Sequence, residues 1–174
     1  MKKIEVKYGL FIGIGLVVWI LLEFALGFHT TRLELGQYTG YAAVIIPIVL
    51  LYQGIKEKRD TELAGSMKFG QGVRAGFLMS LVAAPIIGFF FYVFIEFLNP
   101  RWLELTFELE RAKLLQTGVA AETVSQMLAQ IKPIFTVQVQ VASAFLGTIL
   151  QGLGLSVLIS ALLRWRQRKQ SERA

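Results

Sequence analysis

Two glutamates and the single histidine are the residues of this chain best suited to chemistry. Glu23 and Glu96 each lie inside a long apolar stretch, close to one end of it, and His29 follows the first stretch. Ionising a carboxylate in hydrocarbon is expensive, so an acid in this setting is a candidate functional group. Paired with each other or with His29, the two glutamates could hold a proton or a cation. Alternatively, each reaches the nearby membrane surface or accepts a hydrogen bond.

Other side chains offer less chemistry. Gln138, Gln140 and Gln151 lie in the last apolar stretch and could make interhelical contacts or line a polar cavity. The chain has no HExxH, P-loop or GxSxG motif, and its one aspartate, Asp60, lies outside the apolar stretches. With no cysteine and one histidine, a thiolate or multi-histidine metal site is excluded. We therefore expect no enzymatic activity, no metal and no cofactor.

Four apolar stretches must position these residues. Hydrophobic residues make up 55% of the 174 residues and charged residues 17%, and the mean hydropathy is +0.57. A bilayer is crossed by a helix of about 20 apolar residues. The sequence predicts an all-α integral membrane protein, one membrane domain with four transmembrane helices at about 8–28, 38–54, 73–98 and 135–163. The first stretch is too long for a signal-peptide core and is expected to be an uncleaved span.

Basic residues predict how the spans are oriented. One set, before the first stretch, between the second and third, and after the fourth, comprises Lys2, Lys3, Lys7, Lys56, Lys58, Arg59, Lys68, Arg74, Arg164, Arg166, Arg168, Lys169 and Arg173. The other side has Arg32, Arg101, Arg111, Lys113 and Lys132. The positive-inside rule then places both termini in the cytoplasm.

The same basic residues bear on partners. They lie beside apolar spans and form no stripe with exposed aromatics, so no nucleic-acid partner is expected. Near a membrane surface a lysine or arginine can contact anionic lipid headgroups. The candidates for headgroup contact are Lys56, Lys58, Arg59, Arg164 and Arg166. The alternative is that these basic residues reflect the orientation of the spans alone and bind no particular lipid.

The segment at about 101–132 is the one sizeable part outside the spans. Leu103 to Glu110 reads LELTFELE, an alternation typical of a strand. No partner strand is available, however, and leucine, glutamate, alanine and lysine favour helix. Gly118 interrupts the pattern, and an apolar stripe of period 3.6 follows it. The sequence predicts two short amphipathic helices between the third and fourth spans.

Small residues recur every four positions in the last two spans. The third span has Gly72, Gly76, Ser80, Ala84 and Gly88, and the fourth has Ala144, Thr148, Gly152, Ser156 and Ser160. Such ridges let helix backbones approach closely in a membrane. They predict either packing within the bundle or a homodimer interface. Pro47 and Pro85 are predicted to kink their helices.

The stretch between the second and third spans carries a family resemblance. Gly54-Ile55, Arg59-Asp60, Gly65, Phe69-Gly70 and Gly76 follow one another in an order similar to the domain of unknown function 4199 family, as do KYGLFIGIG at 7–15 and Asn99-Pro100. Ala64 stands where a second glycine is expected, and Gln71 where a basic residue is commoner. The resemblance implies a bacterial membrane protein of four spans and supplies no catalytic residues.

These observations favour a protein of the bacterial inner membrane with a structural, accessory or lipid-interacting role. Its expected partners are membrane lipid and either a second copy or another membrane protein. The alternative is a small oligomeric carrier or channel subunit that is coupled to protons or cations through Glu23 or Glu96.

Overall fold

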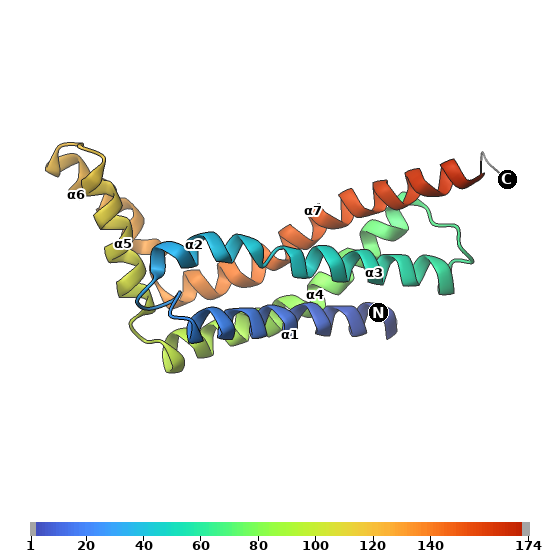
Figure 1. The fold of residues 1–174 in the computed structure, drawn as a ribbon, viewed down its shortest axis with the longest axis horizontal. Coiled ribbons are helices and arrows are strands. Elements are labelled where there is room, and N and C mark those ends of the chain that lie inside the picture. The colour runs from blue at the N-terminus through green and yellow to red at the C-terminus, as the bar shows by residue number, and fades with distance from the viewer. Residues whose placement is uncertain (1–2, 172–174) are drawn as a thin grey trace.

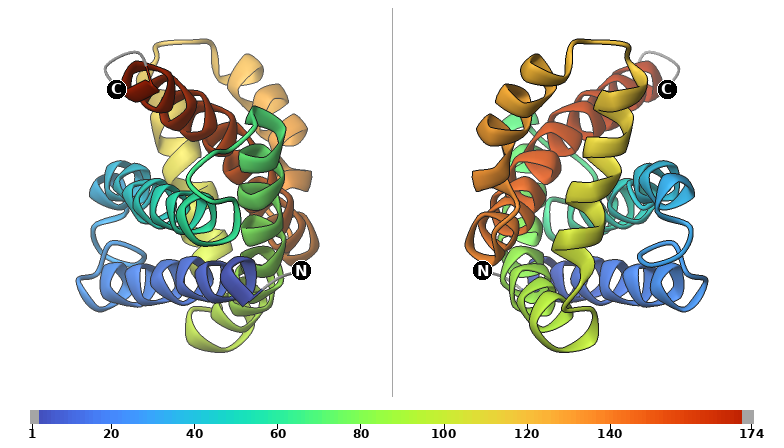
Figure 2. Two further views of the ribbon diagram at one scale, coloured as in Figure 1. Left: turned by 90° about the vertical axis from the view of Figure 1, so that its right-hand side faces the viewer. Right: turned by 90° about the vertical axis from the view of Figure 1, so that its left-hand side faces the viewer.

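The structure is a computed structural model that describes residues 3–171, with side chains up to Lys169. It is helical, with no strand among the described residues. Its elements in chain order are α1 (Lys3–Ala25), α2 (Leu33–Ala42), α3 (Ile45–Glu62), α4 (Phe69–Val93), the π-helix η1 (Phe94–Leu98), α5 (Trp102–Gln116), α6 (Ala121–Ile131), the 3-10 turn η2 (Lys132–Ile134) and α7 (Val137–Ser171). Four long stretches of alternating direction form the bundle, and α5 and α6 stand at one end of it (Figures 1 and 2).

Four stretches within the described residues are long and apolar enough to cross a membrane, as predicted: Lys3–Ala25, Leu33–Glu62, Phe69–Leu98 and Val137–Lys169. Their bounds differ from the sequence prediction. The first span ends at Ala25, not Phe28, because Gly27 adopts a φ of +80° and turns the chain. The fourth begins at Val137 rather than at about 135, since the residues before it form the separate turn η2.

The second span is two helices rather than one kinked helix. The break lies at Ala43 and Val44, and Pro47 occupies the first turn of α3. A proline ring clashes with the carbonyl four residues earlier, which here belongs to Ala43, and proline has no N–H to donate. The helix therefore ends just before this position and restarts.

Helix α4 is the centre of the bundle and contacts α1, α3 and α7. On its α1 side, a Cβ added at Gly9 or Gly13 would lie within 3.0 Å of Val82 or Ile86. The buried core between the spans includes Ile12, Leu51, Ile55, Met79, Ala83 and Leu163.

The contact between α4 and α7 is made by the two small-residue ridges. A Cβ on Gly72 would lie 3.0 Å from Ser160 Cβ. A Cβ on Gly76 would lie 2.6 Å from Ser156 Cβ, and the glycine at 152 would similarly meet Ser80. Glycine on one helix thus faces serine on the other, in antiparallel register. We name these residues the α4–α7 ridge contact: Gly72, Gly76, Ser80, Gly152, Ser156 and Ser160.

The ridge contact is internal to one chain. Ser80, Ser156 and Ser160 are each 2% exposed or less. Farther along, Gly88 lies against Phe145, so the ridge continues toward the α5–α6 end. The ridges therefore pack within the bundle, and a homodimer would have to use another face.

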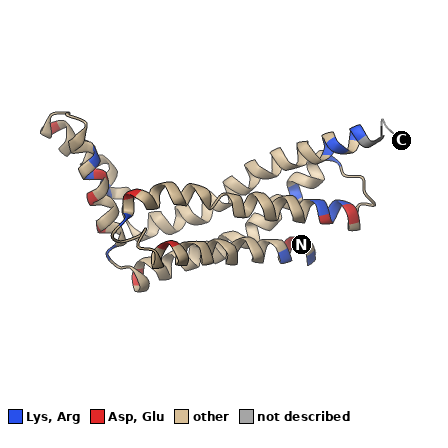
Figure 3. Ribbon diagram, viewed as in Figure 1, with Lys and Arg blue, Asp and Glu red and all other residues tan. Residues whose placement is uncertain are grey.

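Charged residues mark one end of the bundle. Lysines and arginines gather where the described chain begins and ends and where α3 connects to α4, while the α5–α6 end carries both signs (Figure 3). Of the basic residues predicted on the first side, Lys2 and Arg173 lie outside the described residues. We call this the terminal end of the bundle, and the other the hairpin end.

The predicted helical segment is confirmed as α5 and α6. LELTFELE is helical within α5, and Gly118 turns the chain between α5 and α6 with a φ of +73°. Phe107 packs edge-on against Phe135, with ring centroids 5.2 Å apart. The alternation alone does not make a strand here, because no strand among the described residues is available to pair with it and its residues favour helix.

Substituting the ridge glycine Gly152 by alanine tests the α4–α7 ridge contact. A Cβ there would meet Ser80 at 2.5 Å from its Cβ, so the helices must separate. We expect the Gly152→Ala variant to lose about 1–3 kcal/mol, the usual cost of overpacking, measured by thermal unfolding in mild detergent. Gly154→Ala is the matched control, because Gly154 has nothing within 4 Å of its Cβ position. Equal effects of the two substitutions would contradict the observed register.

Candidate functional site

Glu23 and His29 form a buried pair at the hairpin end. Glu23 lies in the last turn of α1 and is 4% exposed, and His29 lies in the turn that follows. His29 Nε2 is 3.3 Å from Glu23 Oε2. Within residues 3–171, Glu23 Oε1 has no hydrogen-bond partner. The contact between Glu23 and His29 that the sequence predicts is therefore formed.

Aromatic rings enclose this pair. The ring of Phe94 lies edge-on to His29 at 5.4 Å, and Trp102 lies 6.5 Å from it. Asn99 donates a hydrogen bond through Nδ2 to the His29 carbonyl oxygen at 2.8 Å. These contacts join the turn after α1 to η1 and to the start of α5. The Glu23–His29 pair therefore also stabilises the hairpin end of the bundle.

The environment of His29 favours its neutral form. Burial lowers the pKa of His29 below its usual value, and the Glu23 carboxylate opposes only part of that change. A neutral imidazole can donate from one nitrogen and accept with the other.

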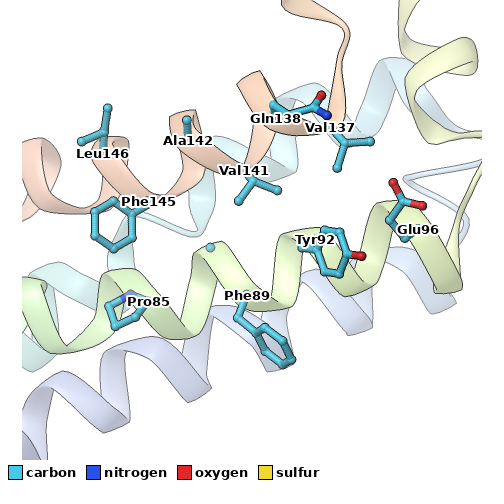
Figure 4. A pocket seen from close by; sticks show the side chains of 11 residues that line it. Pro85, Phe89, Tyr92, Glu96, Val137, Gln138, Val141, Ala142, Phe145 and Leu146 are labelled. Atoms are coloured by element: carbon cyan, nitrogen blue, oxygen red, sulfur yellow. The ribbon is translucent and has the colours of Figure 1, made fainter.

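Glu96 lies elsewhere and is not part of this pair. It projects from η1 and lines a groove of about 890 Å³ between α4 and α7 (Figure 4). We call this the α4–α7 groove, and its lining residues are Pro85, Gly88, Phe89, Tyr92, Glu96, Val137, Gln138, Val141, Ala142, Phe145 and Leu146. The predicted pairing of Glu96 with Glu23 does not occur in this arrangement.

The shape of the α4–α7 groove follows from residue size. Gly88 and Ala142 contribute little side-chain volume to the lining, whereas Phe89, Tyr92 and Leu146 are large and exposed. Because the walls are exposed, the groove opens on the flank of two membrane spans.

The polar lining of the groove is gathered at one end. Tyr92, Glu96 and Gln138 lie at the same end as Val137, while Pro85 and Phe145 lie at the other (Figure 4). Glu96 belongs to a π-helical turn, in which the Asn99 N–H donates to the Phe94 carbonyl oxygen at 2.7 Å. Single π-helical turns are frequent at functional sites.

The other two candidate glutamines, Gln140 and Gln151, face a different surface. Gln140 and Gln151 line a second groove of about 480 Å³ together with Ser143, Thr148 and Gly40 of α2. Gln140 donates through Nε2 to the Ile134 carbonyl oxygen at 2.9 Å. Gln138 is therefore the glutamine that shares a groove with Glu96.

Ion pairs at the terminal end connect α1 to α3. Lys58 pairs with Glu5, which is 1% exposed. Lys7 Nζ lies 2.9 Å from Glu57 Oε2, and the Tyr8 hydroxyl donates to the same oxygen at 2.7 Å. The role of Glu5 was not predicted from the sequence. The signal for it was an acidic residue on an apolar helix beside a basic segment.

These ion pairs bear on which basic residues can contact lipid headgroups. The ammonium of Lys58 is directed into the bundle rather than toward lipid. Arg59 pairs with Asp60 at 2.7 Å, and Arg166 donates to the Tyr52 hydroxyl at 3.1 Å. Three exposed residues remain predicted headgroup contacts: Lys56, Arg164 and Arg166.

Four spans, a helical hairpin and a groove on the flank of the bundle define a multi-pass helical membrane protein. Among the described residues, no group of three or more acidic or histidine side chains could hold a metal ion. A family model described as protein of unknown function (DUF4199) matches residues 7–164, and the chain belongs to this family. No curated protein and no solved structure matches the chain.

Acidification tests the setting of His29. Its folded-state pKa is lowered, so the folded protein binds fewer protons here than the unfolded chain does. Stability from this group is complete above the unfolded pKa of about 6.5 and is lost as the pH falls below it. We expect the melting temperature of the wild type to fall more between pH 7.5 and 5.5 than that of His29→Gln. Parallel curves would show that His29 titrates normally.

Proposed function

We propose that this protein is a non-enzymatic membrane protein with a lipid-interacting role, and that the α4–α7 groove holds one acyl chain of a membrane lipid. The groove is the observation that carries this proposal. Its lining is apolar over most of its length, and it is open on the flank of two membrane spans. A depression in this position is in contact with lipid tails rather than with water.

The length of the groove supports an acyl chain as the occupant. One wall, formed by α4 and η1, runs from Pro85 to Glu96, which at 1.5 Å per residue is about 16 Å of helix. One leaflet contributes about half of a hydrocarbon core roughly 30 Å thick. The groove therefore spans the tail region of one leaflet, with its polar end toward the membrane surface.

We further propose that the protein resides in a bacterial inner membrane with both termini in the cytoplasm. The excess of lysine and arginine at the terminal end supports this orientation. Because the chain lacks cysteine, single cysteines introduced at Gly118 and Gly65 can be labelled selectively. A membrane-impermeant maleimide should label Gly118→Cys, but not Gly65→Cys, in intact spheroplasts. The reverse pattern would contradict the orientation.

One observation favours the alternative, a proton- or cation-coupled carrier. Glu23 is buried, with one carboxylate oxygen unpartnered within the described chain. The enclosing rings and the link to Asn99 favour a fixed pair instead. Proton flux in vesicles that is abolished by Glu23→Gln would select the carrier.

Photolabelling tests the lipid proposal. The purified full chain in nanodiscs would be irradiated with a phospholipid that carries a diazirine on its acyl chain. We expect labelled peptides to come preferentially from α4 around Phe89 and from α7 around Val141. The Ala142→Trp substitution should abolish most of this labelling, because the indole fills the groove.

Leu158→Trp is the control for the added indole. Leu158 is exposed on α7 and is not part of the groove lining. The control should leave the labelling of the groove unchanged. Labelling spread evenly over the exposed faces of α1, α4 and α7, and insensitive to Ala142→Trp, would overturn the proposed function.

A further inference from the structure

We propose that the α4–α7 groove selects a lipid whose headgroup carries a primary ammonium, held by Glu96 together with Tyr92 and Gln138. This inference rests on the proposed lipid-interacting function, and it names the class of lipid. The polar end of the groove is the observation from which it is drawn.

Glu96 is the one charged residue among the eleven that line the groove in the described chain. Within residues 3–171 no basic side chain lies within ion-pair distance of its carboxylate. The nearest basic residue in the sequence, Arg101, does not pair with Glu96. It pairs with Glu104 at 3.6 Å instead. The groove therefore presents a net negative charge at its polar end.

Charge decides the first step of selection. A carboxylate near the membrane surface attracts a cationic group and repels an anionic one. A headgroup with phosphate as its only charge brings negative charge toward Glu96. A zwitterionic headgroup can place its terminal cation on the carboxylate and leave its phosphate at the membrane surface.

Hydrogen bonding decides the second step. A primary ammonium has three N–H donors, as the lysine side chain has. Glu96, Tyr92 and Gln138 line the same end of the groove (Figure 4). The carboxylate, the phenol oxygen and the amide oxygen can each accept one of these bonds. A quaternary ammonium has no N–H to donate, so it gains charge attraction alone.

The photolabelling assay measures this selection when the headgroup is changed and the diazirine chain is kept the same. The three probes are phosphatidylethanolamine, phosphatidylcholine and phosphatidylglycerol in otherwise identical nanodiscs. We expect the ethanolamine lipid to label the groove about tenfold more than the choline lipid, the effect of roughly one charge-assisted hydrogen bond. The glycerol lipid should label least.

The Glu96→Gln variant should remove most of the ethanolamine preference while acyl-chain labelling of the groove persists. Gln138→Leu should reduce the preference by less, because it removes one neutral acceptor. Glu104→Gln is the matched control: it removes an exposed carboxylate at the hairpin end, outside the groove, and should leave the preference unchanged.

The outcomes separate this inference from the proposed function. Equal labelling of the groove by the ethanolamine and choline lipids, unaffected by Glu96→Gln, overturns the headgroup assignment and leaves acyl-chain binding in place. Preference for the glycerol lipid also overturns it. Absence of groove labelling by any of the three probes overturns the proposed function itself.

Discussion

The close contact between α4 and α7 is the constraint on which the rest of the bundle depends. In a membrane no hydrophobic effect drives helices together, so close backbone approach must supply the attraction. Glycine faces serine along this contact, and two of the three serines donate a hydrogen bond within their own helix: Ser80 to the Gly76 carbonyl oxygen at 2.9 Å and Ser156 to that of Gly152 at 2.5 Å. These two hydroxyls are thereby satisfied without separating the helices, whereas the buried Ser160 hydroxyl has no hydrogen-bond partner among the described residues. With α7 on one side and α1 on another, α4 becomes the central element of the bundle, and the groove lies between α4 and α7 near the hairpin end.

The two membrane carboxylates consequently differ in their surroundings. Glu23 is enclosed by η1, α5 and the turn after α1, with His29 as its partner. Glu96 is on the opposite side of the same π-helical segment, exposed at the mouth of a lipid-facing groove. An enclosed acid with one fixed partner stabilises a junction, whereas an exposed acid beside an apolar groove can recognise a ligand. The π-helical turn at Phe94–Leu98 directs Phe94 inward and Glu96 outward, and so serves both sites.

Much of this could be predicted from the sequence, because apolar length and small-residue spacing are local signals. The four spans, the helical hairpin and the two ridges follow from such signals. The register that places Gly72 against Ser160 does not, since a period of four in both helices permits several registers. The Glu23–His29 pair was one of several possible pairings, and the exposure of Glu96 depends on how α7 crosses α4. The ion pair of Lys58 could not be predicted, because its partner, Glu5, is far away in the sequence. Ala64, where the family resemblance calls for glycine, adopts a φ of +50°, which explains the expected residue.

Disulfide trapping tests the α4–α7 register most directly. The chain has no cysteine, and a Cβ at position 72 would lie 3.0 Å from Ser160 Cβ. A disulfide needs roughly 3.5–4.5 Å between its Cβ atoms, so a small separation of the two helices brings this pair into range. In native membranes, the double variant Gly72→Cys with Ser160→Cys should form a crosslink within one chain. The same variant with the second cysteine moved one residue, Gly72→Cys with Ala161→Cys, should not. Crosslinking between two chains, or equal crosslinking of both pairs, would contradict the internal ridge contact and with it the placement of the groove.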